Sequence, residues 1–153
     1  MSSLSETMPR SNFTSRYEWY DTVIGGSGLV LRGRSALEYL GYFSGYRNYN
    51  EIEVYALENG RYANILYKIV NNLSDIEHCK DGRVLCSTFN QAINDMMSTF
   101  PYEDEQALVE ALSDYYYRNN SSFEGLNIHP ANRPLFETLK SWAIEYYDEA
   151  VAY

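Results

Sequence analysis

The sequence predicts an α+β domain, in which a small central sheet with hairpins is packed by a short N-terminal helix and three C-terminal helices. Three observations predict this class. The middle of the chain carries short apolar or alternating runs next to Asn59-Gly60 and Asp81-Gly82, which are turn signals between strands. Beyond residue 87 the apolar residues change to helical spacing. A short helical segment precedes the first apolar run.

Length and composition predict one domain. The chain has 153 residues, of which 45% are hydrophobic and 22% are charged, as in an ordinary globular protein. Residues 1–15 are polar and contain Pro9, so we expect a flexible arm there and a single domain over residues 16–153. The arm lacks the apolar centre of a secretory signal, and no stretch approaches the length of a membrane span.

The N-terminal part of the domain is expected to hold two short helices. The first covers residues 16–24 and ends at the glycine-rich turn 25–28. The apolar run 29–31 is too short to favour helix or strand. Ser35 is a good N-cap for a short buried helix over residues 36–40.

The first predicted hairpin follows. Residues 51–57 alternate between polar and apolar with the period of a half-buried strand, which puts Glu51 and Glu53 on its solvent face. Asn59-Gly60 then predicts a turn, and residues 65–70 continue the sheet.

The second predicted hairpin joins residues 76–79 to residues 84–86 around Asp81-Gly82. In that register Cys79 faces Val84, and Cys86 faces Glu77. The two thiols are then not opposed, so we expect no disulfide. Reduced thiols indicate a cytoplasmic protein.

Three helices are predicted after the sheet. Ser87 is expected to cap a helix over residues 88–97, Asp104 to cap the next, and the last to begin at about Pro134. The inward side of the last helix is expected to consist of Leu135, Leu139, Trp142, Ala143 and Tyr146.

Charge is divided unevenly along the chain, whose net charge is -9. Residues 84–153 hold eleven acidic side chains and three basic ones, whereas residues 1–83 hold ten acidic and nine basic ones. An acidic surface repels nucleic acid and attracts basic protein surfaces. We therefore expect a basic protein partner, and neither direct nucleic-acid binding nor a membrane.

The candidate partner-binding surface lies before and along the second of these helices, where exposed tyrosines add apolar contact. The candidates are Glu103, Asp104, Glu105, Glu110, Asp114, Tyr116 and Tyr117. Three consecutive tyrosines, 115–117, span most of a helix circumference, so at least one should be buried and another exposed. Which of them belong to the core and which to an interface stays open.

A small nucleotide- or phosphate-binding protein is the alternative from another class. Backbone N–H groups of a glycine-rich turn can hold oxyanions, and arginines can bind phosphate. The candidates are Gly26, Ser27, Gly28, Arg32 and Arg34. The turn has neither the spacing of a dinucleotide site nor the lysine of a P-loop. His78, Cys79 and Cys86 fall short of the four ligands of a closed zinc site. We expect no catalytic residue, no metal and no cofactor.

A family resemblance rests on three segments. These are LVLRGRSALEYLG at residues 29–41, the strand at residues 52–57, and RVLCSTFNQAINDMM at residues 83–97. Their order resembles the C-terminal domain of AbiEi-type antitoxins from type IV toxin–antitoxin systems, which have a Ser-Ala-Leu helix, a strand, and a strand-to-helix segment ending in Asp before apolar residues. The resemblance covers about residues 29–147.

The resemblance implies a non-enzymatic antitoxin that counteracts a nucleotidyltransferase-like toxin by occluding a basic surface. Full-length members carry an N-terminal winged helix that binds their promoter, and about 28 residues precede the resemblance here. Autoregulatory DNA binding is therefore not expected. A phage-encoded anti-defence inhibitor that imitates nucleic acid would use the same acidic surface, and the sequence does not separate the two roles.

Overall fold

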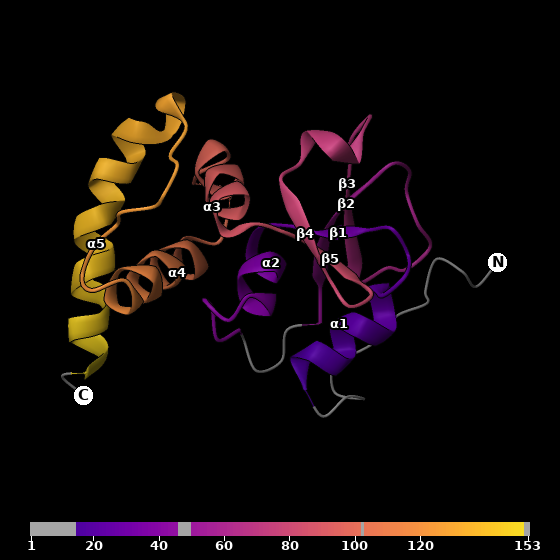
Figure 1. The fold of residues 1–153 in the computed structure, drawn as a ribbon, viewed down its shortest axis with the longest axis horizontal. Coiled ribbons are helices and arrows are strands. Elements are labelled where there is room, and N and C mark those ends of the chain that lie inside the picture. The colour runs from indigo at the N-terminus through magenta and orange to yellow at the C-terminus, as the bar shows by residue number, and fades with distance from the viewer. Residues whose placement is uncertain (1–14, 46–49, 102, 152–153) are drawn as a thin grey trace.

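The computed structural model describes residues 15–45, 50–101 and 103–151, and it confirms the predicted α+β class. A five-stranded mixed sheet lies to one side of the molecule, and three C-terminal helices lie to the other (Figure 1). The arm predicted over residues 1–15 lies, except for Ser15, outside the described residues.

The strands are β1 (Val30–Leu31), β2 (Ile52–Ala56), β3 (Ile65–Ile69), β4 (His78–Asp81) and β5 (Val84–Ser87). Their order in the sheet is β3-β2-β1-β5-β4. The short β1 is central, antiparallel to β2 and parallel to β5. Both of its residues are fully buried, so the apolar run that had no local preference becomes a strand through tertiary packing.

β2 and β3 do not form the first predicted hairpin, because they are parallel and Ile52 pairs with Ile65. Residues 57–64 carry the chain back to the start of β2, where the Ile52 N–H donates to the Asn64 carbonyl oxygen at 2.9 Å. The solvent face predicted for this strand is also wrong. All five residues of β2 are buried, including Glu53, because a neighbouring strand lies on each side and both faces are covered.

β4 and β5 form the second predicted hairpin in a different register. Its turn is Gly82-Arg83, and Asp81 pairs with Val84. Gly82 has a φ of +61°, so the glycine takes the first central position, where the turn requires a positive φ. This shift by one residue places Cys79 directly opposite Cys86, and the prediction that the thiols are not opposed is wrong.

The helices are α1 (Arg16–Ile24), α2 (Gly33–Tyr39), α3 (Phe89–Ser98), α4 (Glu105–Arg118) and α5 (Arg133–Val151), with short 3-10 turns at Leu73–Asp75 and Pro130–Asn132. Asp104 caps α4 as predicted, accepting from the Ala107 N–H at 3.1 Å. Thr88 caps α3 in place of Ser87. Ser35 lies inside α2, where its Oγ accepts from the Glu53 N–H at 2.9 Å instead of capping the helix.

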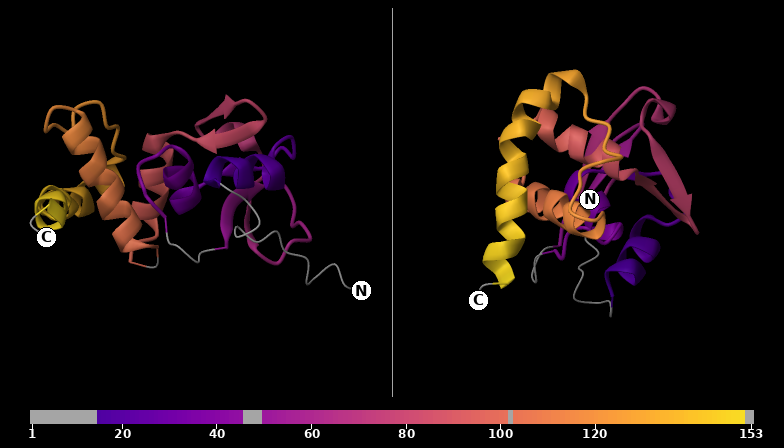
Figure 2. Two further views of the ribbon diagram at one scale, coloured as in Figure 1. Left: turned by 90° about the horizontal axis from the view of Figure 1, so that it is seen from below. Right: turned by 60° about the vertical axis from the view of Figure 1, so that its left-hand side comes forward.

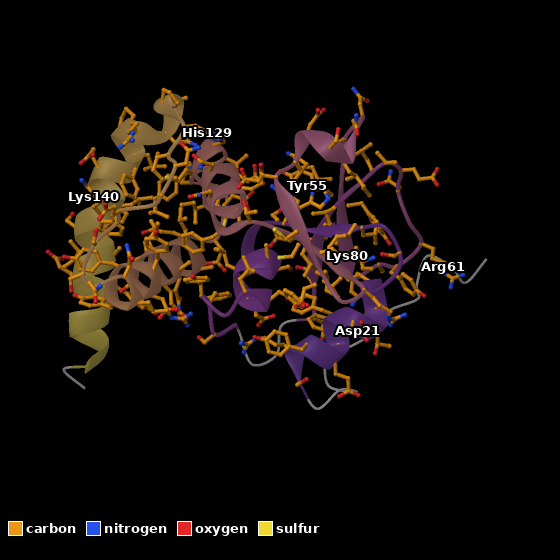
Figure 3. All side chains as sticks on the ribbon, in the orientation of Figure 1. Asp21, Tyr55, Arg61, Lys80, His129 and Lys140 are labelled. Atoms are coloured by element: carbon orange, nitrogen blue, oxygen red, sulfur yellow. The ribbon has the colours of Figure 1, made fainter. Side chains whose placement is uncertain are left out.

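α2 lies between the sheet and the C-terminal helices, α1 runs beneath the β4–β5 hairpin, and α5 packs across α4 at the far end (Figures 1 and 2). The loop before α5 is tied to α3, since the His129 N–H donates to Asn94 Oδ1 at 2.9 Å (Figure 3). The largest fully buried side chains of the main core include Trp19, Tyr20, Leu37, Ile93, Met96, Leu108, Leu112 and Leu139. A smaller cluster of Val30, Tyr55 and Ile76 lies apart from it.

Candidate functional site

Two predicted sets of site residues meet in one largely buried group, which we call the arginine–carboxylate cluster. Arg34 Nη2 lies 3.0 Å from Glu53 Oε2, and Arg34 Nη1 lies 3.1 Å from Asp104 Oδ2. Arg32 Nη1 lies 3.5 Å from Glu53 Oε1, and Arg32 Nη2 lies 3.7 Å from Glu103 Oε1. The arginines predicted to bind phosphate are thus paired with carboxylates, two of which were predicted to face a partner.

The cluster is built on β2 and the start of α2. Burial raises the pKa of the Glu53 carboxyl group, and the positive charge of Arg34 opposes that shift. The Arg32 guanidinium lies over the Tyr55 ring, 4.9 Å from its centroid. Tyr55 Oη donates to Asp95 Oδ2 at 2.7 Å. Because these charges have partners inside the fold, we assign the cluster a structural role, which is to tie the segment before α4 to the sheet.

Glu110 and Asp114 also have partners within the protein. Arg118 Nη2 lies 2.7 Å from Asp114 Oδ2, one turn along α4. Glu110 accepts hydrogen bonds from the Ser44 N–H at 2.8 Å and from Tyr146 Oη at 3.1 Å. Arg118 therefore partly offsets the charge of Asp114, and Glu110 joins α4 to Ser44 and to α5 through neutral donors.

The tyrosine run is used for packing. Tyr115, Tyr116 and Tyr117 are all half-buried, so the predicted division into buried and exposed members is wrong. Tyr117 Oη donates to the Ile144 carbonyl oxygen at 2.8 Å, which joins α4 to α5. The centroid of the Tyr116 ring lies 4.7 Å from that of Phe123. Tyr116 and Tyr117 therefore act as packing residues between α4 and its neighbours.

The residues predicted to bind phosphate are not brought together. The Gly26 and Ser27 N–H groups already donate to backbone carbonyl oxygens. Ser27 and Gly28 line a hollow of about 510 Å³, which neither Arg32 nor Arg34 lines. The glycine-rich turn and the two arginines therefore lie in separate places.

A groove of about 570 Å³ between α4 and α5 offers exposed side chains of the predicted chemistry. We call it the α4–α5 groove, and its lining residues are Glu105, Gln106, Val109, Trp142, Glu145 and Tyr146. Trp142 is 41% exposed, whereas Val109 is 7% exposed and gives the groove an apolar floor. Glu105 and Glu145 are both exposed, and neither forms an ion pair with any other residue that the structure describes.

Helical spacing sets this arrangement. Glu105 and Val109 are one turn apart on α4, and Trp142 and Glu145 are one turn apart on α5, so each pair lies on one face. Lys140, labelled in Figure 3, lies on α5. Its Nζ pairs with Glu137 Oε2 at 2.8 Å, and it does not line the groove. The groove therefore combines an indole, a phenol and carboxylates without a cation among its lining residues.

The sequence predicted one part of this groove and missed another. Glu105 was among the predicted partner-binding residues, whereas Trp142 was expected to face inward and is exposed. Leu139 and Ala143 fill the core positions of α5, with no exposed surface, and leave Trp142 at the border of the apolar stripe. The polar neighbours of Trp142, Ser141 and Glu145, could have indicated that this position faces water.

In the part of the chain that the structure describes, no three His, Cys, Asp or Glu side chains are grouped to hold a metal ion. None of the described helices has both the length and the apolar character that crossing a membrane requires. No family model and no curated protein matches the chain.

Proposed function

We propose that this chain is a non-enzymatic protein-binding domain whose α4–α5 groove takes a basic segment of a protein partner. The observation that carries the proposal is the exposed indole of Trp142 in one groove with Glu105 and Glu145, which form no ion pair with another described residue. A lysine or arginine side chain laid over an indole gains a cation–π interaction of about 0.5–2 kcal/mol. Carboxylates beside it would accept charge-assisted hydrogen bonds from the same cation.

The α4–α5 groove is a smaller candidate binding site than the acidic surface that the sequence predicted. Glu103, Asp104 and Asp114 are each paired with an arginine, so they have less charge to offer than Glu105 and Glu145. Imitation of nucleic acid would require a continuous row of unpaired carboxylates, and these pairings argue against that alternative. A localised groove suits a short basic segment better than a long basic surface.

The partner to test first is a toxin that handles nucleotides. The resemblance to AbiEi-type antitoxins supports this choice, and occlusion of a basic surface on such a toxin is the mechanism it implies. Electrostatic attraction would speed the encounter, while burial of Trp142 would slow dissociation.

A fluorescence titration tests the proposal without knowledge of the partner. The probe is an arginine-rich peptide, and its matched control is a peptide in which glutamate replaces arginine. Of the chain's tryptophans, Trp142 is 41% exposed and Trp19 is fully buried, so a change in emission on binding reports the groove. We expect the arginine-rich peptide to change the emission in a saturable way and the control peptide to leave it unchanged.

Variants locate the binding. We expect Glu105→Gln with Glu145→Gln to weaken binding by about tenfold or more, since two charge-assisted contacts are lost. Glu137→Gln is the matched control, because Glu137 is an exposed carboxylate on α5 that does not line the groove. An equal loss in the Glu137 variant, or an emission change that persists in Trp142→Phe, would rule the groove out as the site.

A further inference from the structure

The hairpin register brings two cysteines face to face at the edge of the sheet. Cys79 on β4 is the direct partner of Cys86 on β5 in an antiparallel pair. Directly opposed residues in such a pair have Cα atoms about 4.5–5.5 Å apart and side chains on the same face. A disulfide needs a Cα–Cα separation of about 4.4–6.8 Å. The Cα spacing of such a pair is therefore compatible with a disulfide bond.

The two thiols differ in access. Cys79 is exposed, whereas Cys86 is 3% exposed. Both line a hollow of about 640 Å³ between the hairpin and the N-terminal helices, which also holds Tyr17 and Tyr39. Because Cys79 is exposed and Cys86 is buried, we expect a small molecule in this hollow to reach the Cys79 sulfur first.

We propose that Cys79 and Cys86 form a site of reversible disulfide formation, which a low-molecular-weight disulfide such as oxidised glutathione closes by thiol–disulfide exchange. The exposed thiol attacks and the buried thiol resolves. This division of roles follows from their places in the hairpin, because only Cys79 meets the oxidant directly.

The reaction has two balanced steps. Cys79 gives its proton to water, and its thiolate attacks one sulfur of oxidised glutathione. The glutathione S–S bond breaks, a mixed disulfide forms on Cys79, and one glutathione leaves as a thiolate that takes up a proton. Cys86 then loses its proton, and its thiolate attacks the Cys79 sulfur and releases the second glutathione. Two electrons and two protons pass from the two cysteines to oxidised glutathione.

The second step depends on pH. Burial raises the pKa of the Cys86 thiol to about 12, and Cys79 and Asp81 add to the shift. Far below that pKa the thiolate fraction rises about tenfold per pH unit. We therefore expect closure of the mixed disulfide to speed up by about tenfold per unit between about pH 7 and pH 9.

Mass spectrometry of the folded full-length chain tests the proposal. The protein is incubated with reduced and oxidised glutathione and quenched with acid. Trypsin cleaves after Lys80 and Arg83, which lie between the two cysteines. An internal disulfide therefore yields two linked peptides, whereas a mixed disulfide yields a peptide carrying glutathione. We expect the linked pair to replace a transient adduct on Cys79, and reduced glutathione to reverse it.

Variants assign the roles. Cys86→Ser should stop at the glutathione adduct on Cys79, and Cys79→Ser should stay unmodified while folded. The wild-type result decides the proposal even where a variant folds poorly. A folded wild-type chain that keeps both thiols, stops at the adduct at pH 9, or links Cys79 of two molecules would overturn it.

Discussion

Gly33 lies where both the backbone conformation and the Glu53 side chain leave no room for a larger residue. Its φ is +52°, and a Cβ there would lie 2.9 Å from Glu53 Oε1. Gly82 has a similar φ of +61°, with nothing within 4 Å of its Cβ position. A side chain at either position would strain the backbone, because both φ angles are positive. Only a side chain at position 33 would also crowd the arginine–carboxylate cluster.

We expect Gly33→Ala to lower the free energy of unfolding by about 3 kcal/mol, and Gly82→Ala to lower it by about 1 kcal/mol. Both alanines carry backbone strain, and only the first also pushes Glu53 away from its arginines. Urea unfolding followed by circular dichroism measures both losses. Equal losses would contradict the crowding at Gly33.

Tyr55 makes stability depend on pH in the alkaline range. Burial and the hydrogen bond to Asp95 raise the pKa of the Tyr55 phenol to about 12, while Arg32 opposes the shift. A tyrosine in the unfolded chain has a pKa of about 10. The stability that Tyr55 contributes is therefore fully present below about pH 10 and is lost as pH rises toward 12.

We expect the wild-type chain to lose about 2 kcal/mol more than Tyr55→Phe between about pH 9.5 and pH 12, because phenylalanine has no proton to lose. Urea unfolding of both proteins at a series of pH values measures the difference. Parallel curves for the two proteins would show that the phenol is not shifted.

Glu53 and Trp142 lie on other sides of their elements than their sequence patterns predict, for opposite reasons. Glu53 has the alternation of a solvent-facing residue, yet Arg32 and Arg34 fold over its side of β2. Trp142 has the helical spacing of a core residue, yet Ala143 takes the core position and leaves the indole outside. Local pattern gives the face of an element, and tertiary contacts decide whether that face is covered.

At the scale of helices and strands, the Asp104 side chain has two structural roles. It caps α4 through the Ala107 N–H, and it pairs with Arg34 in the arginine–carboxylate cluster. Loss of a helix cap costs about 1 kcal/mol. Removal of a largely buried carboxylate costs more, because its arginine loses an ion pair.

We expect Asp104→Ala to destabilise the protein by about 3 kcal/mol and Asp104→Asn by about half as much, because asparagine can still cap the helix. Glu105→Gln is the control, since this neighbouring carboxylate is exposed, and we expect a change within about 0.5 kcal/mol. Chemical denaturation ranks the three variants. An asparagine variant as unstable as the alanine variant would mean that the cap contributes little.

Elements with local signals were predictable, and elements that depend on distant partners were not. The bounds of α1 and the cap of α4 agree with the prediction, since the glycine turn and Asp104 set them locally. The parallel pairing of β2 and β3 depends on the return path of residues 57–64, which Asn59-Gly60 does not reveal. The hairpin register depends on whether Gly82 is the first or the second central residue of the turn, and the sequence does not decide between them.

Over the whole molecule, the sequence predicted the amount of acidic charge but not which acidic side chains form ion pairs. The acidic C-terminal half predicted an acidic surface for a basic partner, but Arg32 and Arg34 reach across the fold to Glu103 and Asp104. These pairs join residues that are far apart in the chain, so no local pattern reports them. Glu105 and Glu145, which line the α4–α5 groove, form no ion pair with another residue in the described part of the chain.

We expect salt to act in opposite directions on folding and on binding. Raising sodium chloride from about 0.05 M to about 0.5 M should raise the free energy of unfolding by about 1 kcal/mol, because it screens repulsion within a chain of net charge -9. The same change should weaken binding of an arginine-rich peptide by about tenfold. Thermal unfolding and the fluorescence titration measure the two effects, and a loss of stability with salt would show that exposed ion pairs outweigh the repulsion.

Nuclear magnetic resonance mapping during titration with the arginine-rich peptide tests the division between structural and binding charge most directly. We expect the Trp142 indole N–H signal and the amide signals of residues 105–109 and 142–146 to shift together, with little change at Arg32 or Arg34. Shifts centred on the arginine–carboxylate cluster, or spread evenly over the acidic half, would contradict the assignment of binding to the α4–α5 groove.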